Sequence, residues 1–289
     1  MNRLDGKRRA QVVAALVEGN SIRATCRMTG VAKGTVLKLV ADLGEAAREY
    51  QDRTLRNLPC TRIQCDEIWS FCYAKDKNLP DSMRHKPGVG SIWTWTAICA
   101  DTKLVPSFHI GTRDAGCAWE FMNDLAGRLC KRIQLTTDGH RAYLDAVDTA
   151  IGNHQIDYAM LIKIYGEARA EEARYSPPTC IGTDVKIIAG NPDPAHISTS
   201  YVERQNLTMR MSIRRFTRLT NAFSKKIENH EHSVALHFLH YNFARIHQSI
   251  RCSPAMEAGV TDRLWSVKDI VALLEEREAQ VRPTGTDSN

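Results

Sequence analysis

The stretch RIQCDEIWSFCYA, residues 62–74, decides the fold that this sequence predicts. Its apolar, β-branched and aromatic side chains are typical of a buried strand. Asp66 stands in the middle of that strand, between Ile63 and Ile68. Aspartate is depleted in strands, and its charge is costly in a core unless another group pairs with it. Asp66 is therefore interpreted as a functional residue, because no structural need explains it.

Outward from this strand, the pattern predicts an α/β fold with a mixed sheet. Two further strands are followed by helix, strand, helix and strand, an order typical of this fold class. The predicted ranges are 91–100, 105–110, 116–130, 133–137, 142–150 and 156–161. Residues 163–197 contain several prolines and show no clear period, so we expect an irregular insertion there. Further helices are predicted at 198–219, 228–246 and 267–279.

Two more carboxylates are candidates to act with Asp66. Asp138 ends the strand 133–137 and precedes Gly139, at the carboxyl edge where α/β folds place ligands. Glu203 lies on the basic helix 198–219, in the string SYVERQNLTMR. If the three converge, their mutual repulsion must be offset, and oxygen-seeking Mg²⁺ (or Mn²⁺) suits carboxylates without His or Cys. Two such ions about 4 Å apart are a known arrangement for phosphoryl transfer.

Each of these carboxylates has a structural alternative. Asp-Gly after a strand is a common turn, and a glutamate on a basic helix is usually an ion-pair partner. The gap of 65 positions between Asp138 and Glu203 also contains other glutamates: Glu167, Glu171 and Glu172. These three stand in the run GEARAEEAR, where helical spacing gives each a surface arginine as partner. Glu203 is therefore the preferred third carboxylate.

The N-terminal residues predict a helix-turn-helix. Helices are expected at 7–18, from Ser21 to about 28, and at 32–43, with a turn at Gly30. Val36 and Leu39 would face inward. The exposed face of the third helix, where a major-groove reader places its side chains, would then carry Lys33, Thr35 and Lys38. A plain three-helix bundle without a role in DNA binding is the alternative.

Basic charge is concentrated in two blocks of the chain. Residues 1–58 hold 11 Lys/Arg and 6 Asp/Glu, and residues 198–251 hold 9 and 3. The segment between them, 59–197, holds 15 and 17 and is slightly acidic. This distribution favours a polyanion gripped at two places, although solvated helix faces would produce a similar pattern.

Composition excludes several classes of protein. Hydrophobic residues make up 43% and charged residues 25% of the 289 positions, which is ordinary for a globular chain. No apolar run approaches the ~20 residues of a membrane span, so we expect no membrane partner. Without a secretory signal, and with nine cysteines that form no CxxC pair, the chain is expected in a reducing cytoplasm. No Gly-rich phosphate loop is present, so we expect no nucleotide cofactor.

Three strings of the sequence carry a family resemblance. CDEIWSF, TTDGHRAY and YVERQN, at residues 65–71, 136–143 and 201–206, resemble motifs of the insertion-sequence-one (IS-one) family of bacterial transposases. The resemblance covers about residues 60–260. It implies the ribonuclease-H-like core of the DDE transposases and integrases, with Asp66, Asp138 and Glu203 as the catalytic carboxylates that hold Mg²⁺ or Mn²⁺. Shorter relatives carry a zinc finger that this chain lacks, so DNA-end recognition would rest on the helix-turn-helix.

The resemblance also implies an activity, a domain organisation and partners. The expected domains are a helix-turn-helix at 1–45, a linker helix at 46–58, a catalytic domain at 59–252 with the insertion 163–197, and a C-terminal helical tail at 253–289. The expected activity is cleavage of DNA at transposon ends followed by strand transfer into target DNA. The chain would act as a homo-oligomer on DNA, associated with a bacterial nucleoid. Further DNA contacts are expected from the basic helix: Arg204, Asn206, Arg210 and Arg214.

Two alternatives to this activity stay open at the level of the sequence. One is a DNA-binding regulator whose transposase-derived core is inactive. The other is a metal-dependent nuclease that cuts DNA without joining the cut strand to a target. The intact set of three carboxylates argues against the first, and the second shares the same core.

Overall fold

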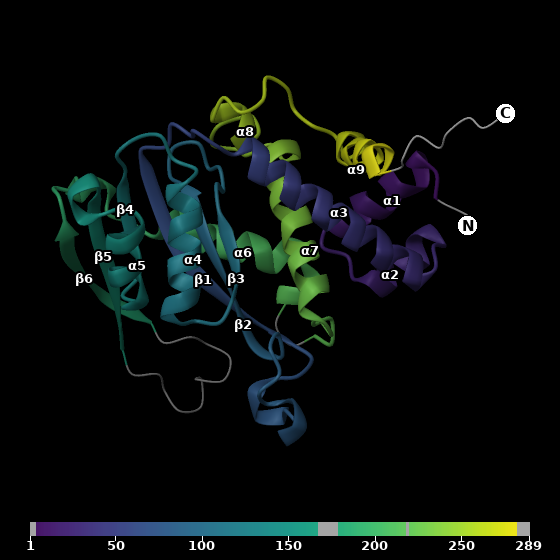
Figure 1. Ribbon diagram of the computed structural model, residues 1–289, viewed down its shortest axis with the longest axis horizontal. Helices are drawn as coiled ribbons and strands as arrows, with labels where there is room; N and C mark the ends of the chain where they lie inside the picture. Colours follow the sequence, from purple (N-terminus) through teal and green to yellow (C-terminus); the bar gives the residue numbers. More distant parts are fainter. Residues whose placement is uncertain (1–3, 167–178, 218–219, 282–289) are drawn as a thin grey trace. The chain divides into compact units, whose positions relative to one another are not determined.

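A computed structural model of the chain describes residues 4–166, 179–217 and 220–281. It contains one six-stranded sheet with the strand order β3-β2-β1-β4-β5-β6 (Figure 1). The strands are β1 (Arg62–Cys72), β2 (Gly90–Cys99), β3 (Phe108–Gly111), β4 (Gln134–Thr137), β5 (Asp157–Tyr165) and β6 (Cys180–Ala189). β1, β4 and β5 run parallel, whereas β6 is antiparallel to β5. The predicted α/β class with a mixed sheet is confirmed.

The chain divides into two compact units, and the division falls within β1, β2 and the helix α6 (Ser200–Ser212). One unit comprises Asn57–Ile68 and Thr94–Gln205 and contains the greater part of the sheet. In this unit α4 (Ala115–Ala126) and α5 (Ala142–Ala150) lie side by side on one face of the sheet (Figure 1). Trp95 from β2, Phe121 from α4 and Tyr143 from α5 are fully buried and form the aromatic centre of this layer.

The expectation of a wholly irregular insertion at 163–197 is wrong. β5 continues to Tyr165, and β6 pairs with it along nearly its whole length. β6 lies at the edge of the sheet, and its apolar side chains are exposed: Ile181, Val185 and Ile187. An edge strand with no buried face lacks the apolar alternation by which a strand is recognised in sequence. The glutamates of this segment, Glu167, Glu171 and Glu172, lie outside the described residues.

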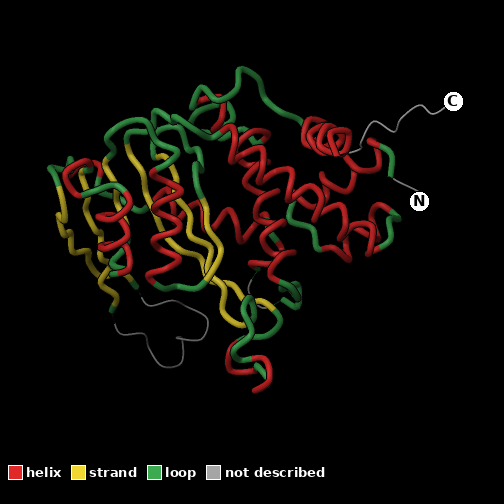
Figure 2. Tube along the Cα trace, in the orientation of Figure 1, coloured by secondary structure: helices red, strands yellow, loops and turns green. Residues whose placement is uncertain are grey.

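The other unit comprises Met1–Arg56, Trp69–Trp93 and Asn206–Asn289, and its described part is mostly helical (Figure 2). Its helices are α1 (Gly6–Val17), α2 (Ile22–Thr29), α3 (Lys33–Thr54), α7 (Ile227–Leu239), α8 (Pro254–Glu257) and α9 (Val267–Val281). Short 3₁₀ turns at Asp76–Asn78 and Asp81–Met83 follow β1. α3 packs against both α7 and α9, and α1 packs against α9. None of the described helices has the length and apolarity that crossing a membrane requires.

The first helices match the sequence prediction, but the end of the third does not. Ser21 caps α2, Gly30 closes it with a positive φ of 66°, and Val36 and Leu39 of α3 are buried. The predicted stop before Gly44 and the separate linker helix 46–58 are wrong, because α3 is one continuous helix to Thr54. The DNA-binding role of these helices and the end of that domain at residue 45 stay predictions.

Gly44 has a packing role in α3 instead of a terminating one. A Cβ atom added there would collide with Cα and Cβ of His232 on α7 and would lie 2.7 Å from the carbonyl oxygen of His232. The missing side chain therefore allows the backbones of α3 and α7 to approach closely.

The basic helix is shorter than predicted. α6 (Ser200–Ser212) ends seven residues before the expected limit of 219. Ile213 adopts an extended backbone, and its side chain is buried together with Phe216 of the following 3₁₀ turn, Arg214–Phe216. Arg214 thus lies on that turn and not on the helix, which corrects its predicted place.

We predict that Gly44→Ala lowers the melting temperature, although alanine favours an isolated helix by up to ~1 kcal/mol. The added methyl group overpacks the α3–α7 contact, and overpacking costs about 1–3 kcal/mol. Gly34→Ala is the matched control on the same helix, because a Cβ atom there meets nothing within 4 Å. Thermal unfolding of both variants checks the prediction. Equal melting temperatures for Gly44→Ala and Gly34→Ala would contradict it.

Candidate metal and active site

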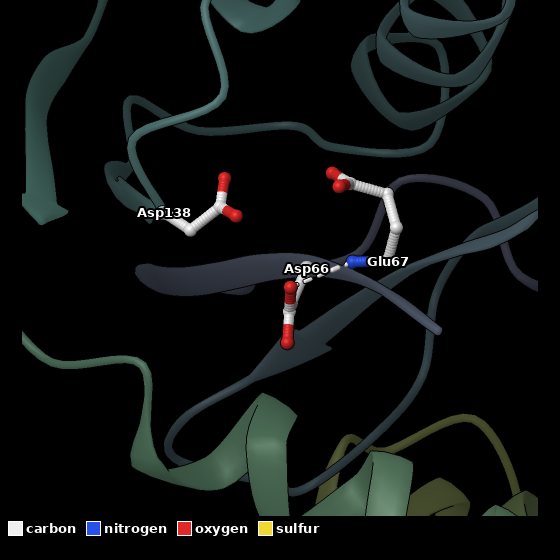
Figure 3. Close-up of side chains that lie close together, drawn as sticks. All are labelled: Asp66, Glu67 and Asp138. Atoms are coloured by element: carbon white, nitrogen blue, oxygen red, sulfur yellow. Dashed lines mark hydrogen bonds between the residues drawn. The ribbon is translucent and has the colours of Figure 1, made fainter. Parts of the chain in front are cut away.

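Strand register brings the first two predicted carboxylates together. β1 and β4 are parallel neighbours, with Cys65 opposite Thr137 at the last paired position. Asp66 follows Cys65 on β1, and Asp138 follows Thr137 at the end of β4. The two aspartates therefore lie at the same level of the sheet. Asp66, Glu67 and Asp138 each bring one carboxylate oxygen within 4.8 Å of the other two. Figure 3 shows the three side chains. Asp66 and Asp138, which the sequence suggested could lie close together, are neighbours in the structure.

Glu67 is a member of the cluster that the sequence reasoning missed. Successive residues of a strand point to opposite faces, and Figure 3 shows Asp66 on one side of β1 and Glu67 with Asp138 on the other. The Glu67 side chain is fully buried, with an exposed fraction of 0%. Arg113, in the loop before α4, donates from Nε to Glu67 at 2.9 Å and from Nη2 to Asp138 at 3.4 Å. Arg113 thus joins the two carboxylates on that side.

The start of α6 is fixed to β1 by a buried amide. Oε1 of Gln64 accepts hydrogen bonds from the backbone N–H groups of Tyr201 at 2.8 Å and Val202 at 3.2 Å. Gln64 precedes Asp66 by two residues, so both side chains lie on the same face of β1. Glu203 is the next residue of α6. This contact explains how a residue 137 positions after Asp66 comes near it.

Glu203 lies near Asp66 but outside the cluster of three. Its negative charge contributes to raising the pKa of Asp66. One oxygen of Glu203 accepts from Thr199 Oγ1 at 2.5 Å, and the other forms an ion pair with Lys163 of β5. The third predicted carboxylate is therefore held beside the site by a cation of the sheet.

Burial and nearby negative charges raise the pKa of two of these carboxyl groups. Burial raises the pKa of Asp66 to about 7, and the charges of Glu67, Asp138 and Glu203 add to the increase. Burial and the charge of Asp138 likewise raise the pKa of Glu67 to about 7, against the opposing influence of Arg113. A divalent cation would relieve both effects, because it supplies the positive charge that the carboxylates lack.

The donor set fits a hard cation. The cluster offers carboxylate oxygens alone, without the imidazole or thiolate ligands that favour zinc. A divalent cation can displace the proton from a carboxyl group with a raised pKa, and the cation then stabilises the negative charge of the carboxylate. The residues present thus fit Mg²⁺ or Mn²⁺.

The residues predicted to contact DNA are on the surface to different degrees. Five have exposed side chains: Lys33, Thr35, Lys38, Arg204 and Arg214. Two are half-buried: Asn206 and Arg210. Lys38 forms an ion pair with Asp42 one turn later, 2.7 Å away, so part of its charge is already compensated.

Comparisons with known proteins were made for the sequence and for the structure. No protein-family profile matches the sequence, and no curated protein matches it. A piggyBac transposase synaptic complex with hairpin DNA aligns over 98% of this chain and 74% of its own, with 12% identity and a TM-score of 0.39. A pre-cleavage Mos1 transpososome aligns over 97% and 80%, with 8% identity and a TM-score of 0.30. The Mos1 transposase paired-end complex with the left transposon end aligns over 52% and 58%, with 13% identity and a TM-score of 0.21. Similarity this low carries no inference about activity, so the residues of the site must carry it.

We predict that Asp66→Asn stabilises the metal-free protein, and more so at pH 8 than at pH 5. A carboxyl whose pKa is raised on folding binds its proton more tightly in the folded state. Its favourable contribution is therefore present at low pH and is lost as the pH rises towards about 7. Asparagine removes that dependence, so the gain in unfolding free energy should grow by on the order of 2 kcal/mol between the two pH values.

Thermal or denaturant unfolding in EDTA measures this gain. Asp184→Asn, which removes an exposed carboxylate of β6, is the matched control and should show no such growth. A gain of equal size at both pH values would show that the Asp66 carboxyl is not desolvated in the folded protein.

Proposed function

We propose that this chain is a DDE transposase that cleaves DNA at the ends of a mobile element and joins the freed ends to target DNA. The observation that carries the proposal is the meeting of two strand carboxylates, Asp66 and Asp138, with Glu203 of α6 held near Asp66. Asp66 and Asp138 meet through the register of β1 and β4, and the Gln64 contact brings Glu203 to the same face as Asp66. A ribonuclease-H-like core and kinship with the IS-one family belong to the proposal.

The proposed metal ligands are Asp66, Asp138 and Glu203, for Mg²⁺ or Mn²⁺. When bound, the metal would supply Lewis-acid stabilisation of charge on the scissile phosphate and on the attacking and leaving oxygens. The chain supplies the positioning. β1 and β4 hold the two aspartates in register, and α6 holds the glutamate.

Two cations of the site are proposed to keep the carboxylates in place when no metal is bound. Lys163 pairs with Glu203, and Arg113 pairs with Glu67 and Asp138. Glu67 is proposed to position Asp138 through Arg113, since its fully buried carboxylate pairs with the same guanidinium that contacts Asp138. For Glu203 to bind the same metal as Asp66, its carboxylate would have to leave Lys163.

DNA is proposed to contact both basic blocks. The first turns of α3 would contribute Lys33, Thr35 and Lys38, consistent with their exposure, as part of a helix-turn-helix within residues 1–45. The second block would contribute Arg204, Asn206, Arg210 and Arg214. Binding to two DNA ends is most simply achieved by a homo-oligomer, in which each copy holds one end.

We predict that Glu203→Gln reduces end cleavage by at least ~10²-fold and leaves DNA binding intact. The loss has the scale of removing one key electrostatic group from an active site. Asp66→Asn and Asp138→Asn should behave in the same way, and EDTA should abolish cleavage by the unmodified chain. The substrate is a DNA duplex carrying the inverted repeats that flank the coding region.

Glu67→Gln is the control that separates a ligand from a positioning residue. It removes the charge that pairs with Arg113, so we expect a smaller loss of cleavage than for Glu203→Gln. Glu171→Gln and Glu172→Gln should cut normally. A dead Glu67, Glu171 or Glu172 variant beside a fully active Glu203→Gln would refute the assignment. Full cleavage in EDTA would refute the metal, and no cleavage under any condition would favour a DNA-binding regulator.

The DNA-reading role of α3 has its own test. We predict that Lys38→Ala in the full chain weakens binding to duplex DNA several-fold at low salt. One lost phosphate contact should lower the slope of log K against log salt by about 0.9. Titration of a labelled duplex at several salt concentrations measures both quantities. An unchanged affinity and slope would show that this face of α3 does not bind DNA.

A further inference from the structure

A second candidate binding site lies in the helical unit, within Met1–Arg56 and Asn206–Asn289. It is a groove of about 790 Å³ lined by residues of α1 to α3, of the segments 212–215 and 220–226, and of α7. Six of its lining residues are basic: Arg23, Lys33, Arg214, Arg215, Lys225 and Lys226. Among the described residues that line the groove, none is Asp or Glu. A hollow with this charge is complementary to a polyanion.

Arg215 is the most informative of these cations. Its Nη1 donates to Ser224 Oγ at 2.9 Å, whereas its buried Nη2 has no hydrogen-bond partner in the part of the chain that the structure describes. None of the ion pairs formed by the described residues includes Arg215. Burial lowers the pKa of its guanidinium. Arg215 as a whole is half-buried and lines the groove. A partly desolvated guanidinium without an anion is costly, so this position suits an anionic ligand in the groove.

A buried polar network holds Arg215 in place. Ser224 Oγ, which accepts from Arg215, lies 3.0 Å from Nδ1 of His230, and Nε2 of His230 lies 3.3 Å from Ser70 Oγ. Burial and the nearby charge of Arg215 lower the pKa of His230 to about 3, so this ring is neutral at physiological pH. The network therefore orients the guanidinium without neutralising it. A preorganised arginine of this kind is well suited to bidentate recognition of phosphate.

The groove is not only basic. Half-buried apolar side chains line it, among them Leu16, Ile22 and Leu37. Phe223 also lines it, with Nζ of Lys225 lying 3.9 Å from the centre of its ring. A DNA duplex presents phosphates outside and keeps its base faces stacked, so it needs cations alone. An unpaired strand also exposes bases, which bind against apolar and aromatic side chains beside a basic track.

We infer that this groove binds an unpaired DNA strand, with one phosphate on Arg215 and its neighbours on Lys225 and Lys226. The inference rests on the proposed function, because a transposase separates and releases strand ends during cleavage. It adds a strand-holding site in the helical unit to the carboxylate site of the sheet.

The experiment compares single-stranded and duplex forms of one 20-nucleotide sequence, each labelled with fluorescein. Anisotropy titrations with the full chain are made in EDTA, which prevents cleavage, at several NaCl concentrations. Lys225→Ala/Lys226→Ala should weaken single-strand binding by about 10-fold at 0.1 M NaCl. Two lost phosphate contacts should also lower the salt slope by about 1.4. Lys268→Ala, an exposed lysine of α9, is the matched control and should change neither quantity.

Arg215→Gln separates a ligand-binding role from a structural one. Glutamine keeps a polar amide at this position and removes the unpaired charge, so the melting temperature should be unchanged or higher. Single-strand affinity should fall at least 10-fold. A lower melting temperature with unchanged affinity would show that Arg215 is structural, and equal loss of duplex and single-strand binding would overturn the choice of an unpaired strand.

Failure of the groove and failure of the proposed function give different results. If the groove variants bind single strands normally while metal-dependent cleavage by the unmodified chain is observed, the groove inference fails and the transposase proposal stands. If the groove variants lose single-strand binding but the unmodified chain never cuts, the groove stands as a DNA site and the proposed activity fails.

Discussion

Negative charge is concentrated around the two central strands of the sheet, β1 and β4, and the surrounding side chains must compensate for it. Four carboxylates lie in this region: Asp66, Glu67, Asp138 and Glu203. Buried charges of one sign repel strongly, so such a cluster persists only with compensation. Arg113 pairs with Glu67 and Asp138, and Lys163 pairs with Glu203. Protonation of Asp66 and Glu67, whose pKa values are raised, also reduces the negative charge. A site that depends on protons and side-chain cations when metal-free is one that a divalent ion would stabilise.

Backbone geometry accounts for the arrangement of these groups. Parallel pairing of β1 with β4 sets two aspartates at one level, and the two-residue period of β1 places the side chains of Asp66 and Glu67 on opposite faces. The face that carries Asp66 also carries Gln64, whose amide fixes the start of α6 and hence the place of Glu203. On the opposite face, Glu67 interacts with Arg113 and with Tyr143 of α5. One strand thus organises both the candidate metal ligands and their support.

Much of this could be predicted from local patterns. The apolar run around Asp66, the strand that ends at Asp138 and the helix 142–150 appear in the structure as the sequence indicates. Glu67 was not predicted because adjacent residues of a strand point to opposite faces, so the sequence gives no sign that Glu67 lies near both Asp66 and Asp138. Arg113 and Lys163 come from a loop and from a distant strand, and only tertiary packing brings them to the carboxylates. The edge strand β6 and the continuous α3 were missed for a related reason: exposed strands carry no period, and Gly44 is explained by a neighbouring helix.

The central claim is that Asp66, Asp138 and Glu203 together form a divalent-metal site. A crystal structure of the full chain with DNA and Mn²⁺, with anomalous diffraction collected at the manganese edge, tests it most directly. We expect a manganese peak bound by the carboxylates of Asp66 and Asp138, with Glu203 turned from Lys163 to the metal. The absence of manganese at Asp66, with Glu203 still paired to Lys163 in the presence of DNA, would contradict it.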